Sequence, residues 1–326
     1  MEQDMLPFLF RKLVVPVGII VPVGAVFLAF LVDYGLLEFV GVLMQPIMKP
    51  VWKTPGRSAV DAMASFVGSY SIGLLITNRV FKEGKYTVKE AAIIATGFST
   101  VSATFMVIVA KTTGLMQMWN LYFWSTLAVT FLVTAVSVRI YPLKNKGEET
   151  VSGTSDRKAG PNPPTFANAL AQALNAVQAA PGLRQAVTAN LKEGFLMAMS
   201  ILPSIMSVGL LGLLLAKYTV LFDIVGYLFL PITKLFGLPD AALAAKATAL
   251  EVAEMFLPAL LVVKASLATR YVIAVVSVSS ILFFSASIPC ILATEIPLTI
   301  PEISLIWLER ALLSLILALL AAQIIF

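Results

Sequence analysis

The chain has 326 residues, of which 59% are apolar and 13% are charged, with a formal net charge of +5 and a mean hydropathy of +0.92. An ordinary globular domain is about 45–50% apolar and about 25% charged. Apolar stretches of spanning length recur along most of the sequence, and water cannot host that much apolar surface. The sequence therefore predicts an integral membrane protein and excludes a soluble fold, a disordered chain and a nucleic-acid binder.

The chain has no histidine and a single cysteine, Cys290. A histidine zinc site, a Cys-His nucleophile and a disulfide framework are therefore excluded, and we expect neither an enzyme nor a metal cofactor. Residues 1–12 carry two acids and two bases, and no small-residue cleavage site follows the next apolar run. We expect a retained first membrane segment and not a signal peptide.

Apolar runs with few charges predict the membrane segments in chain order. A spanning helix needs about 20 apolar residues, so the run at 36–48 is more typical of an interfacial or re-entrant segment, and the run at 219–236 is borderline. The runs fall at about 13–32, 36–48, 59–78, 88–110, 117–141, 193–216, 219–236, 239–263, 271–294 and 303–326.

Residues 142–164 are rich in charged, Gly, Ser, Thr and Pro residues, which predicts a solvated, flexible linker. Four apolar residues then recur at helical spacing, which predicts a weakly amphipathic helix lying on the membrane or on the protein. These residues are Phe166, Leu170, Leu174 and Val177. The linker and this helix, 142–192, separate a first membrane repeat over 1–141 from a second over 193–326.

The two halves match one another in sequence. Pro-Ile-Met-Lys at 46–49 recurs as Pro-Ile-Thr-Lys at 231–234, and Phe-Ser-Thr-Val-Ser-Ala at 98–103 is answered by Phe-Ser-Ala-Ser-Ile-Pro at 284–289. The predicted fold is an all-α polytopic membrane protein with two structural repeats. Each repeat has long spanning helices, a short helix and a re-entrant helix-hairpin candidate. Such duplication is typical of transporters, whose substrate site lies between the repeats.

Two topologies are open. If the short helices cross the membrane and the hairpins are re-entrant, 20 of the 23 Lys and Arg residues fall on the side of the N-terminus, which makes both termini cytoplasmic. If the short helices are interfacial, the second repeat is inverted and the same residues divide 14 to 8, with Arg310 inside the last segment. The charge count favours the first arrangement, and the helix lengths favour the second.

Two carboxylates in the second hairpin candidate, 239–263, are candidate ligands. Glu251 and Glu254 are three residues apart, so they lie on one face of a helix inside an apolar segment. An ionised group in the bilayer costs roughly 2.5–3.5 kcal/mol or more, so it is usually functional there. The pair is a candidate for binding Na⁺, a proton or the hydroxyl and amine groups of a polar solute. The alternative is a buried ion pair with Lys246 or with a basic residue of the other half.

The first hairpin candidate, 59–78, offers short polar side chains instead of a carboxylate pair. Small residues over 66–73 permit a break that frees backbone groups to face a ligand, although they are equally typical of close helix packing. We take Ser69, Ser71 and Asn78 as candidate ligands.

Hydroxyl groups recur at mid-membrane in both halves. Pro289 lacks a backbone donor and is expected to kink or break its helix. Each hydroxyl, taken singly, also has its own i−4 carbonyl as an alternative partner. The candidate ligands of this group are Ser99, Thr100, Ser102, Ser285 and Ser287.

Four segments, at 65–79, 96–102, 254–258 and 284–290, resemble the bacterial YjiH family, which carries the nucleoside-recognition or Gate domain. The resemblance covers nearly the whole chain except the linker. It implies a multi-pass protein of the bacterial inner membrane, related through the Gate domain to concentrative nucleoside transporters, the membrane part of ferrous-iron transporter B and spore maturation proteins.

The resemblance places Gate-like domains at about 45–112 and 231–300. In the nucleoside transporters, two re-entrant hairpins carry acidic and hydroxyl residues to the substrate, and the repeats are inverted. Here the second hairpin fits that pattern, whereas the first has no carboxylate except Asp61 near its start. Family members are often found beside a second, smaller Gate-domain membrane protein, so a hetero-oligomeric partner or a homo-oligomer is implied.

The leading hypothesis is a secondary transporter of a small polar solute, nucleoside-like or amino-acid-like, coupled to Na⁺ or H⁺. The alternative is a non-transporting membrane subunit that recognises a ligand or scaffolds the second Gate-domain protein. An intramembrane enzyme is left with only a serine or carboxylate mechanism.

Overall fold

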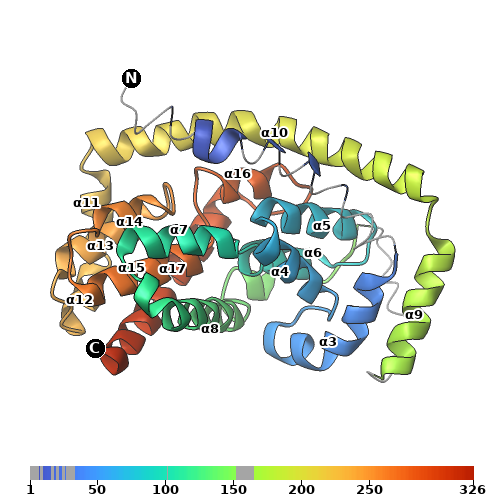
Figure 1. Ribbon diagram of the computed structural model, residues 1–326, viewed down its shortest axis with the longest axis horizontal. Helices are drawn as coiled ribbons and strands as arrows, with labels where there is room; N and C mark the ends of the chain where they lie inside the picture. The colour runs from blue at the N-terminus through green and yellow to red at the C-terminus, as the bar shows by residue number, and fades with distance from the viewer. Residues whose placement is uncertain are drawn as a thin grey trace.

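The computed structural model describes residues 34–100, 102–151 and 165–326, together with residues 7, 10–15, 18, 19, 22, 23 and 26. Every regular element in these ranges is helical (Figure 1), which confirms the predicted all-α class. Most of the run at 13–32 and of the linker at 142–164 lies outside the described residues.

The first half contains a sequence of helices that ends in one of spanning length. Met116–Ser137, which contains α8, is long and apolar enough to cross a membrane. The helices of this half are α3 (Leu36–Trp52), α4 (Ser58–Val67), α5 (Tyr70–Lys82), α6 (Val88–Gly97), α7 (Ala103–Thr113) and α8 (Trp119–Ser137).

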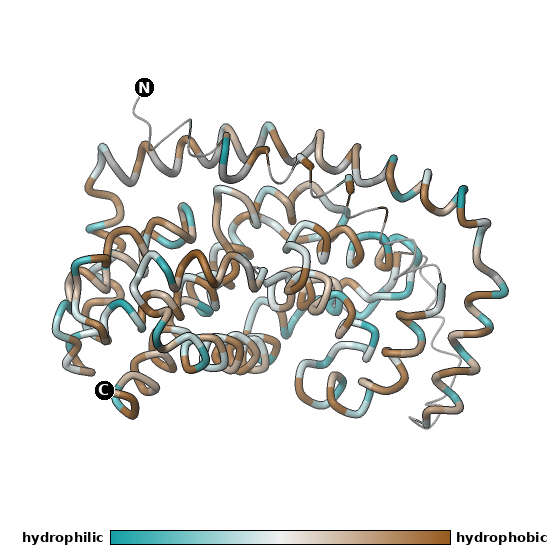
Figure 2. Tube along the Cα trace, viewed as in Figure 1, coloured by the Kyte–Doolittle hydropathy of each residue, from teal (hydrophilic) through white to brown (hydrophobic). Residues whose placement is uncertain are grey.

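The second half follows α9 (Phe166–Ala179). It also ends in a helix of spanning length and composition, α17, and Figure 2 shows hydrophobic residues along all of these helices. Its helices are α10 (Leu183–Tyr218), α11 (Leu221–Gly226), α12 (Leu230–Leu235), α13 (Ala241–Leu250), α14 (Leu257–Leu261), α15 (Leu267–Ser279), α16 (Ser287–Leu292) and α17 (Ile300–Ile325).

Both hairpin candidates form helix-turn-helix pairs. In the first hairpin, α4 and α5 pack together and the break falls at Gly68 and Ser69, inside the segment of small residues that predicts it. The amide of Gly68 donates to Ala64 O at 2.9 Å, and the Ser69 side chain caps α5 by accepting from Ile72 N at 3.4 Å. In the second hairpin, α13 and α14 pack together around a turn at 251–256.

A glycine lets the two arms of the first hairpin approach closely. A Cβ placed on Gly73 would lie 1.8 Å from Ser65 Oγ and 3.1 Å from Asp61 O. We therefore expect Gly73→Ala to lower the free energy of unfolding by about 1–3 kcal/mol, because the new methyl group overpacks the hairpin.

Thermal unfolding of the purified protein measures this effect. Gly182→Ala is the matched control, since nothing lies within 4 Å of its Cβ position. Adding Ser65→Ala to the Gly73 variant should restore part of the loss. Equal stability of the Gly73 and Gly182 variants would contradict the packing argument.

In the described part of the chain, besides the hairpin candidates, three of the predicted apolar runs are each divided into two helices, and one of these is the run at 219–236, which contains α11 and α12. The run at 88–110 is interrupted between α6 and α7, which the sequence reading did not predict, and the run at 271–294 is interrupted between α15 and α16. We call the segments 98–102 and 280–286 the first and second breaks. Pro289 does not form the second break but lies in the first turn of α16, where no intrahelical donor is required.

The two interrupted helices run in opposite directions. Arg270, near the start of α15, donates to Thr113 O at the end of α7 at 2.9 Å. Glu295, just past the end of α16, pairs with Lys82 at 3.1 Å, and Lys82 shortly precedes the start of α6. The start of each interrupted helix therefore lies beside the end of the other, so the two are antiparallel. This is the relation expected if the second repeat is inverted, and it differs from the arrangement favoured by the charge count. The orientation of residues 1–6 stays a prediction, because they lie outside the described residues.

The exposed residues Lys49 and Lys264 allow the antiparallel arrangement of the interrupted helices to be tested. Lys49 lies near the end of α3, which Arg139 ties to the end of α8 by donating to Val51 O at 2.7 Å, whereas Lys264 precedes the start of α15. In a Cys290→Ala background we expect Lys49→Cys and Lys264→Cys to react with a membrane-impermeant thiol reagent from opposite sides. Labelling of both from the same side of sealed vesicles would contradict the antiparallel arrangement.

The predicted amphipathic helix is α9, which lies across one end of α10 (Figure 1). It packs against α3, where Phe39 and Phe166 make an edge-to-face ring contact with centroids 5.5 Å apart. The side chains of Leu170, Leu174 and Val177 are exposed. The stripe thus contacts α3 through Phe166, whereas its other three residues keep part of their apolar surface uncovered by the described part of the protein.

Candidate functional site

The turn of the second hairpin buries both predicted carboxylates. One oxygen of Glu254 accepts from the backbone N–H groups of Phe256 and Leu257, at 2.7 and 2.9 Å, and so caps the start of α14. One oxygen of Glu251 accepts from Trp307 Nε1 at 2.5 Å. The other oxygen of each carboxylate is buried without a hydrogen-bond partner in the described part of the protein.

The turn of the second hairpin is docked on the second break by its backbone. Phe284 N donates to Val252 O at 2.7 Å, and Ser285 N donates to Ala253 O at 2.9 Å. These two bonds hold the chain of the break beside the turn that carries the two carboxylates. The Ser285 hydroxyl is buried and has no partner within the described ranges.

The start of α5 in the first hairpin meets the same region from the other repeat. The Tyr70 and Phe283 rings contact edge to face with centroids 6.0 Å apart, and α5 packs against α16. The side chains of Tyr70, Ser71 and Cys290 lie next to one another, and Tyr70 interacts electrostatically with Glu254. The hydroxyls of Tyr70 and Ser71 are buried, and among the described residues they have no partner beyond one another and the Cys290 thiol.

The first break contributes a further buried hydroxyl. Thr100 Oγ1 has no hydrogen-bond partner among the described residues, and the backbone here turns so that Thr100 N donates to Phe98 O at 2.8 Å. Phe105 in α7 contacts Phe256 beside the second-hairpin turn, with ring centroids 5.9 Å apart. The first break is thus linked to the second hairpin through α7.

The ten predicted ligands divide into two groups. Five keep a buried oxygen atom without a partner in the described structure: Ser71, Thr100, Glu251, Glu254 and Ser285. The other five already use their side chains in local structure: Ser69 and Ser102 cap helices, Ser99 donates to Ile94 O, Ser287 bonds the Phe283 backbone, and Asn78 accepts from Glu295 N.

The alternative reading of the acidic pair as an ion pair with Lys246 is wrong. Lys246 Nζ contacts Asp223 Oδ1 at 2.6 Å. The basic residue that interacts electrostatically with Glu251 is Arg310, from α17 of the same half. Its guanidinium donates to Ser279 O, Ser280 O and Thr134 Oγ1 instead of bonding the carboxylate directly.

Arg310, Trp307 and Tyr70 are site neighbours that the sequence reading did not select. Arg310 carried a signal, because it is the basic residue inside the last apolar run, where a charge is costly. Trp307 and Tyr70 carried none, since aromatic residues are usual in membrane helices.

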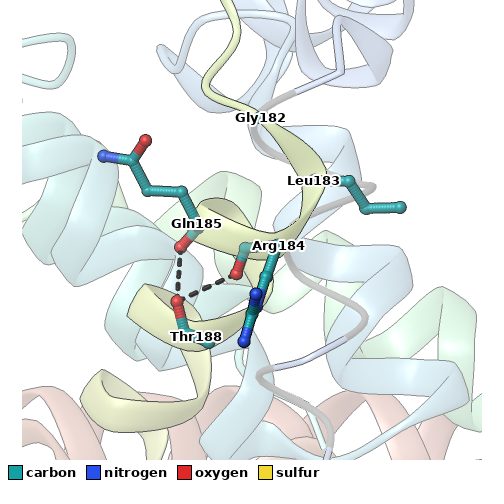
Figure 3. A pocket seen from close by; sticks show the side chains of 5 residues that line it. All are labelled: Gly182, Leu183, Arg184, Gln185 and Thr188. Atoms are coloured by element: carbon teal, nitrogen blue, oxygen red, sulfur yellow. Dashed lines mark hydrogen bonds between the residues drawn. The ribbon is translucent and has the colours of Figure 1, made fainter.

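A hollow elsewhere on the surface lies at the start of α10 and is lined by Gly182, Leu183, Arg184, Gln185 and Thr188 (Figure 3). The Thr188 hydroxyl lies 2.9 Å from Arg184 O and 3.0 Å from Gln185 O, so it bonds its own helix. The hollow contains none of the predicted ligands and is distinct from the site at the hairpin turns.

A family model matches part of the chain. Residues 14–116 match the Gate model, described as nucleoside recognition. This segment includes the first hairpin and the first break. The Gate level of the predicted resemblance is confirmed, whereas the YjiH family and a second Gate-like domain at about 231–300 stay predictions.

Comparison with whole proteins gives one curated relative and two solved structures. An uncharacterized protein of Alkalihalophilus pseudofirmus, BpOF4_10220, is 31% identical over 302 residues, which are 91% of this chain and 65% of the relative. Two CNTnw double variants in outward-facing states align with TM-scores of 0.63 and 0.61 at 15% and 16% identity, and each alignment covers 98% of this chain and 76% of the other. The chain therefore carries a Gate match over residues 14–116 and has the fold of CNTnw.

Proposed function

We propose that the chain is a secondary transporter of the bacterial inner membrane that moves a small polar solute, nucleoside-like or amino-acid-like, with Na⁺ or H⁺ as the coupling ion. The observation that carries the proposal is a group of buried polar atoms without partners in the described structure. These atoms belong to Ser71, Thr100, Glu251, Glu254 and Ser285, which come from both hairpins and both breaks.

Energetics support a ligand at these atoms. An unsatisfied buried polar group costs about 1–3 kcal/mol, and more when it is charged. Five such groups in neighbouring turns of one membrane protein are costly unless a ligand satisfies them. Discontinuous helices and hairpin turns between two antiparallel repeats are the usual setting of such a ligand in transporters.

The chemistry of each group defines its proposed role. The free oxygens of Glu251 and Glu254 are acceptors when ionised, so they suit a proton, a sodium ion or an N–H or O–H group of the solute. The hydroxyls of Ser71, Thr100 and Ser285 both donate and accept, and they suit the remaining polar groups of the solute. The break at Gly68 allows the first hairpin to open as a gate.

The proposed orientation follows from the antiparallel arrangement. The side that includes Lys49 then carries 14 Lys and Arg residues, and the side that includes Lys264 carries 8. By the positive-inside rule, we assign the side of Lys49 to the cytoplasm, and this proposal places Arg11 and Lys12 on the opposite side, in place of the cytoplasmic N-terminus expected from the first arrangement.

Uptake by the purified chain in proteoliposomes tests the proposal. The panel comprises labelled nucleosides, nucleobases and amino acids, each measured with an inward Na⁺ gradient, an inward proton gradient and neither. We expect accumulation of one solute class that requires one of the two gradients. No accumulation of any class, by protein that is shown to be folded, would overturn the transport proposal for these solutes.

The second candidate function, a membrane subunit that scaffolds a second Gate-domain protein, is favoured by the partly exposed apolar stripe of α9. The residues Leu170, Leu174 and Val177 on this stripe are 42–53% exposed in the described structure. A stoichiometric membrane partner that is required for uptake would favour this candidate over a chain that transports alone.

A further inference from the structure

We infer that Arg310 is a positioning residue that holds the first and second breaks in one fixed arrangement. The inference rests on the proposed function only for the benefit of the link to transport. The geometry of the link and its test by cysteine labelling do not require that the protein transports a solute. Arg310 is in α17 and is fully buried, with 1% of its surface exposed. A buried guanidinium is costly unless its donors are satisfied.

The guanidinium satisfies the end of α15 at the second break. Its Nε and Nη2 donate to Ser280 O at 3.1 Å and to Ser279 O at 2.8 Å. The last carbonyls of a helix have no intrahelical partner and carry a partial negative charge, which a cation stabilises. The next residue, Ile281, has φ of +68°, a left-handed conformation that is unfavourable for a β-branched residue. Arg310 thus holds the helix end at a strained turn.

The same guanidinium reaches the first break through one side chain of α8. Its Nη1 donates to Thr134 Oγ1 at 3.0 Å, and the Thr134 hydroxyl proton is shared between Gly97 O, in the last residue of α6, at 3.0 Å and Thr130 O of its own helix at 2.8 Å. A Cβ on Gly97 would lie 2.4 Å from Thr134 Cγ2, so the glycine permits this approach. Arg310 therefore joins the ends of α6 and α15, which belong to different repeats.

A fixed link between the breaks has a consequence for the site. Thr100 follows the end of α6 and Ser285 follows the end of α15, so the link fixes the spacing between hydroxyls contributed by the two repeats. Glu251 also interacts electrostatically with Arg310, so the hairpin turn is held by the same charge. The guanidinium of Arg310 therefore places a permanent positive charge between the first and second breaks.

The native thiol of Cys290 provides the test. It is the single cysteine, is buried and lies in α16 directly after the second break. We expect Thr134→Val to raise the rate of Cys290 labelling by a small uncharged maleimide about tenfold, because the lost hydrogen bond to a charged group favours local opening. Thr134→Ser keeps the hydroxyl and should restore the parent rate.

Thr130→Val is the matched control, because the Thr130 hydroxyl bonds Thr126 O of its own helix at 2.7 Å. Arg310→Lys keeps the charge but loses the planar fork, and it should raise labelling at least as much as Thr134→Val. Unfolding temperatures are measured for all variants, so that global unfolding is distinguished from local opening. Equal labelling of the parent and Thr134→Val proteins, or equal acceleration by Thr130→Val, would overturn the inference. Failure of uptake alone would bear on the proposed function and not on this link.

Discussion

Replacing Glu254 by glutamine should lower solute uptake about 10–100-fold while leaving the protein folded. The glutamine carbonyl oxygen can still accept from Phe256 N and Leu257 N, which the Glu254 side chain caps. The amide group then replaces the unpartnered oxygen, Oε1, with a donor that neither a cation nor a solute donor can use. The loss corresponds to about 1.5–3 kcal/mol, the usual value for a hydrogen bond to a charged group.

Initial uptake rates in proteoliposomes measure this effect. Glu295→Gln is the matched control, because Glu295 is an exposed partner of Lys82 and lies past the end of α16. Uptake by Glu254→Gln at the parent rate would show that the carboxylate does not bind the solute or the ion.

Replacing Asp61 by alanine should lower the free energy of unfolding by about 2–5 kcal/mol. One carboxyl oxygen of Asp61 accepts from the Thr77 hydroxyl at 2.7 Å, and the other accepts from the Tyr86 hydroxyl at 2.6 Å. All three side chains are buried, so the alanine leaves the Tyr86 hydroxyl unsatisfied and removes the link between the two arms of the first hairpin.

Unfolding of the variants in detergent measures this loss. Tyr86→Phe removes one of the two bonds and should cost less than Asp61→Ala. Asp223→Ala is the control, because Asp223 forms a half-exposed ion pair with Lys246 and should change stability by less than about 1 kcal/mol. Equal effects of the Asp61 and Asp223 variants would contradict a structural role for the buried carboxyl group.

The Asp61 cluster and the carboxylates of the second hairpin show how local contacts distinguish similar residues. Asp61 has hydrogen-bond donors for both oxygens, and we assign it to the stability of the hairpin. Glu251 and Glu254 each have one oxygen satisfied and one unpartnered within the described chain, and we assign them to ligand binding. Sequence spacing alone does not separate these two cases.

Composition and local pattern were sufficient to predict much of the fold. The apolar runs predicted the membrane class, and the small residues over 66–73 permitted the break that the structure places at Gly68 and Ser69. The helical spacing of Phe166, Leu170 and Leu174 predicted α9.

The first break was not predicted from the sequence, because it lies inside a run that is apolar enough on average to be taken as one helix. The chain around Gly97 carries hydroxyl side chains but no charge and no proline that would end an apolar run, and Gly97 contacts Thr134, which is distant in sequence. The second break was predicted from Pro289, but the turn lies before it, at Ile281, and depends on Arg310 of α17. Tertiary contacts therefore determined what local sequence could not.

The charge count favoured the arrangement without inversion, whereas the two interrupted helices run antiparallel, and some of the counted basic residues are committed to local contacts. Lys246 pairs with Asp223, and Arg270 donates to the carbonyl of Thr113 at the end of α7. The rule counts lysine and arginine as if each were free to face the cytoplasm. Residues that are committed to such contacts weaken its prediction.

The most direct test of the proposed site is ligand-induced stabilisation of the purified protein and of its Glu254→Gln variant. Unfolding temperatures are measured with nucleosides, nucleobases, amino acids and dipeptides, with and without Na⁺ and across pH. A ligand at about 100 times its Kd stabilises the folded state by ~2.7 kcal/mol. We predict that one solute class stabilises the parent and that Glu254→Gln abolishes the shift. Stabilisation that is equal in both proteins, or none for any solute with folded parent protein, would contradict a solute site at the hairpin turns.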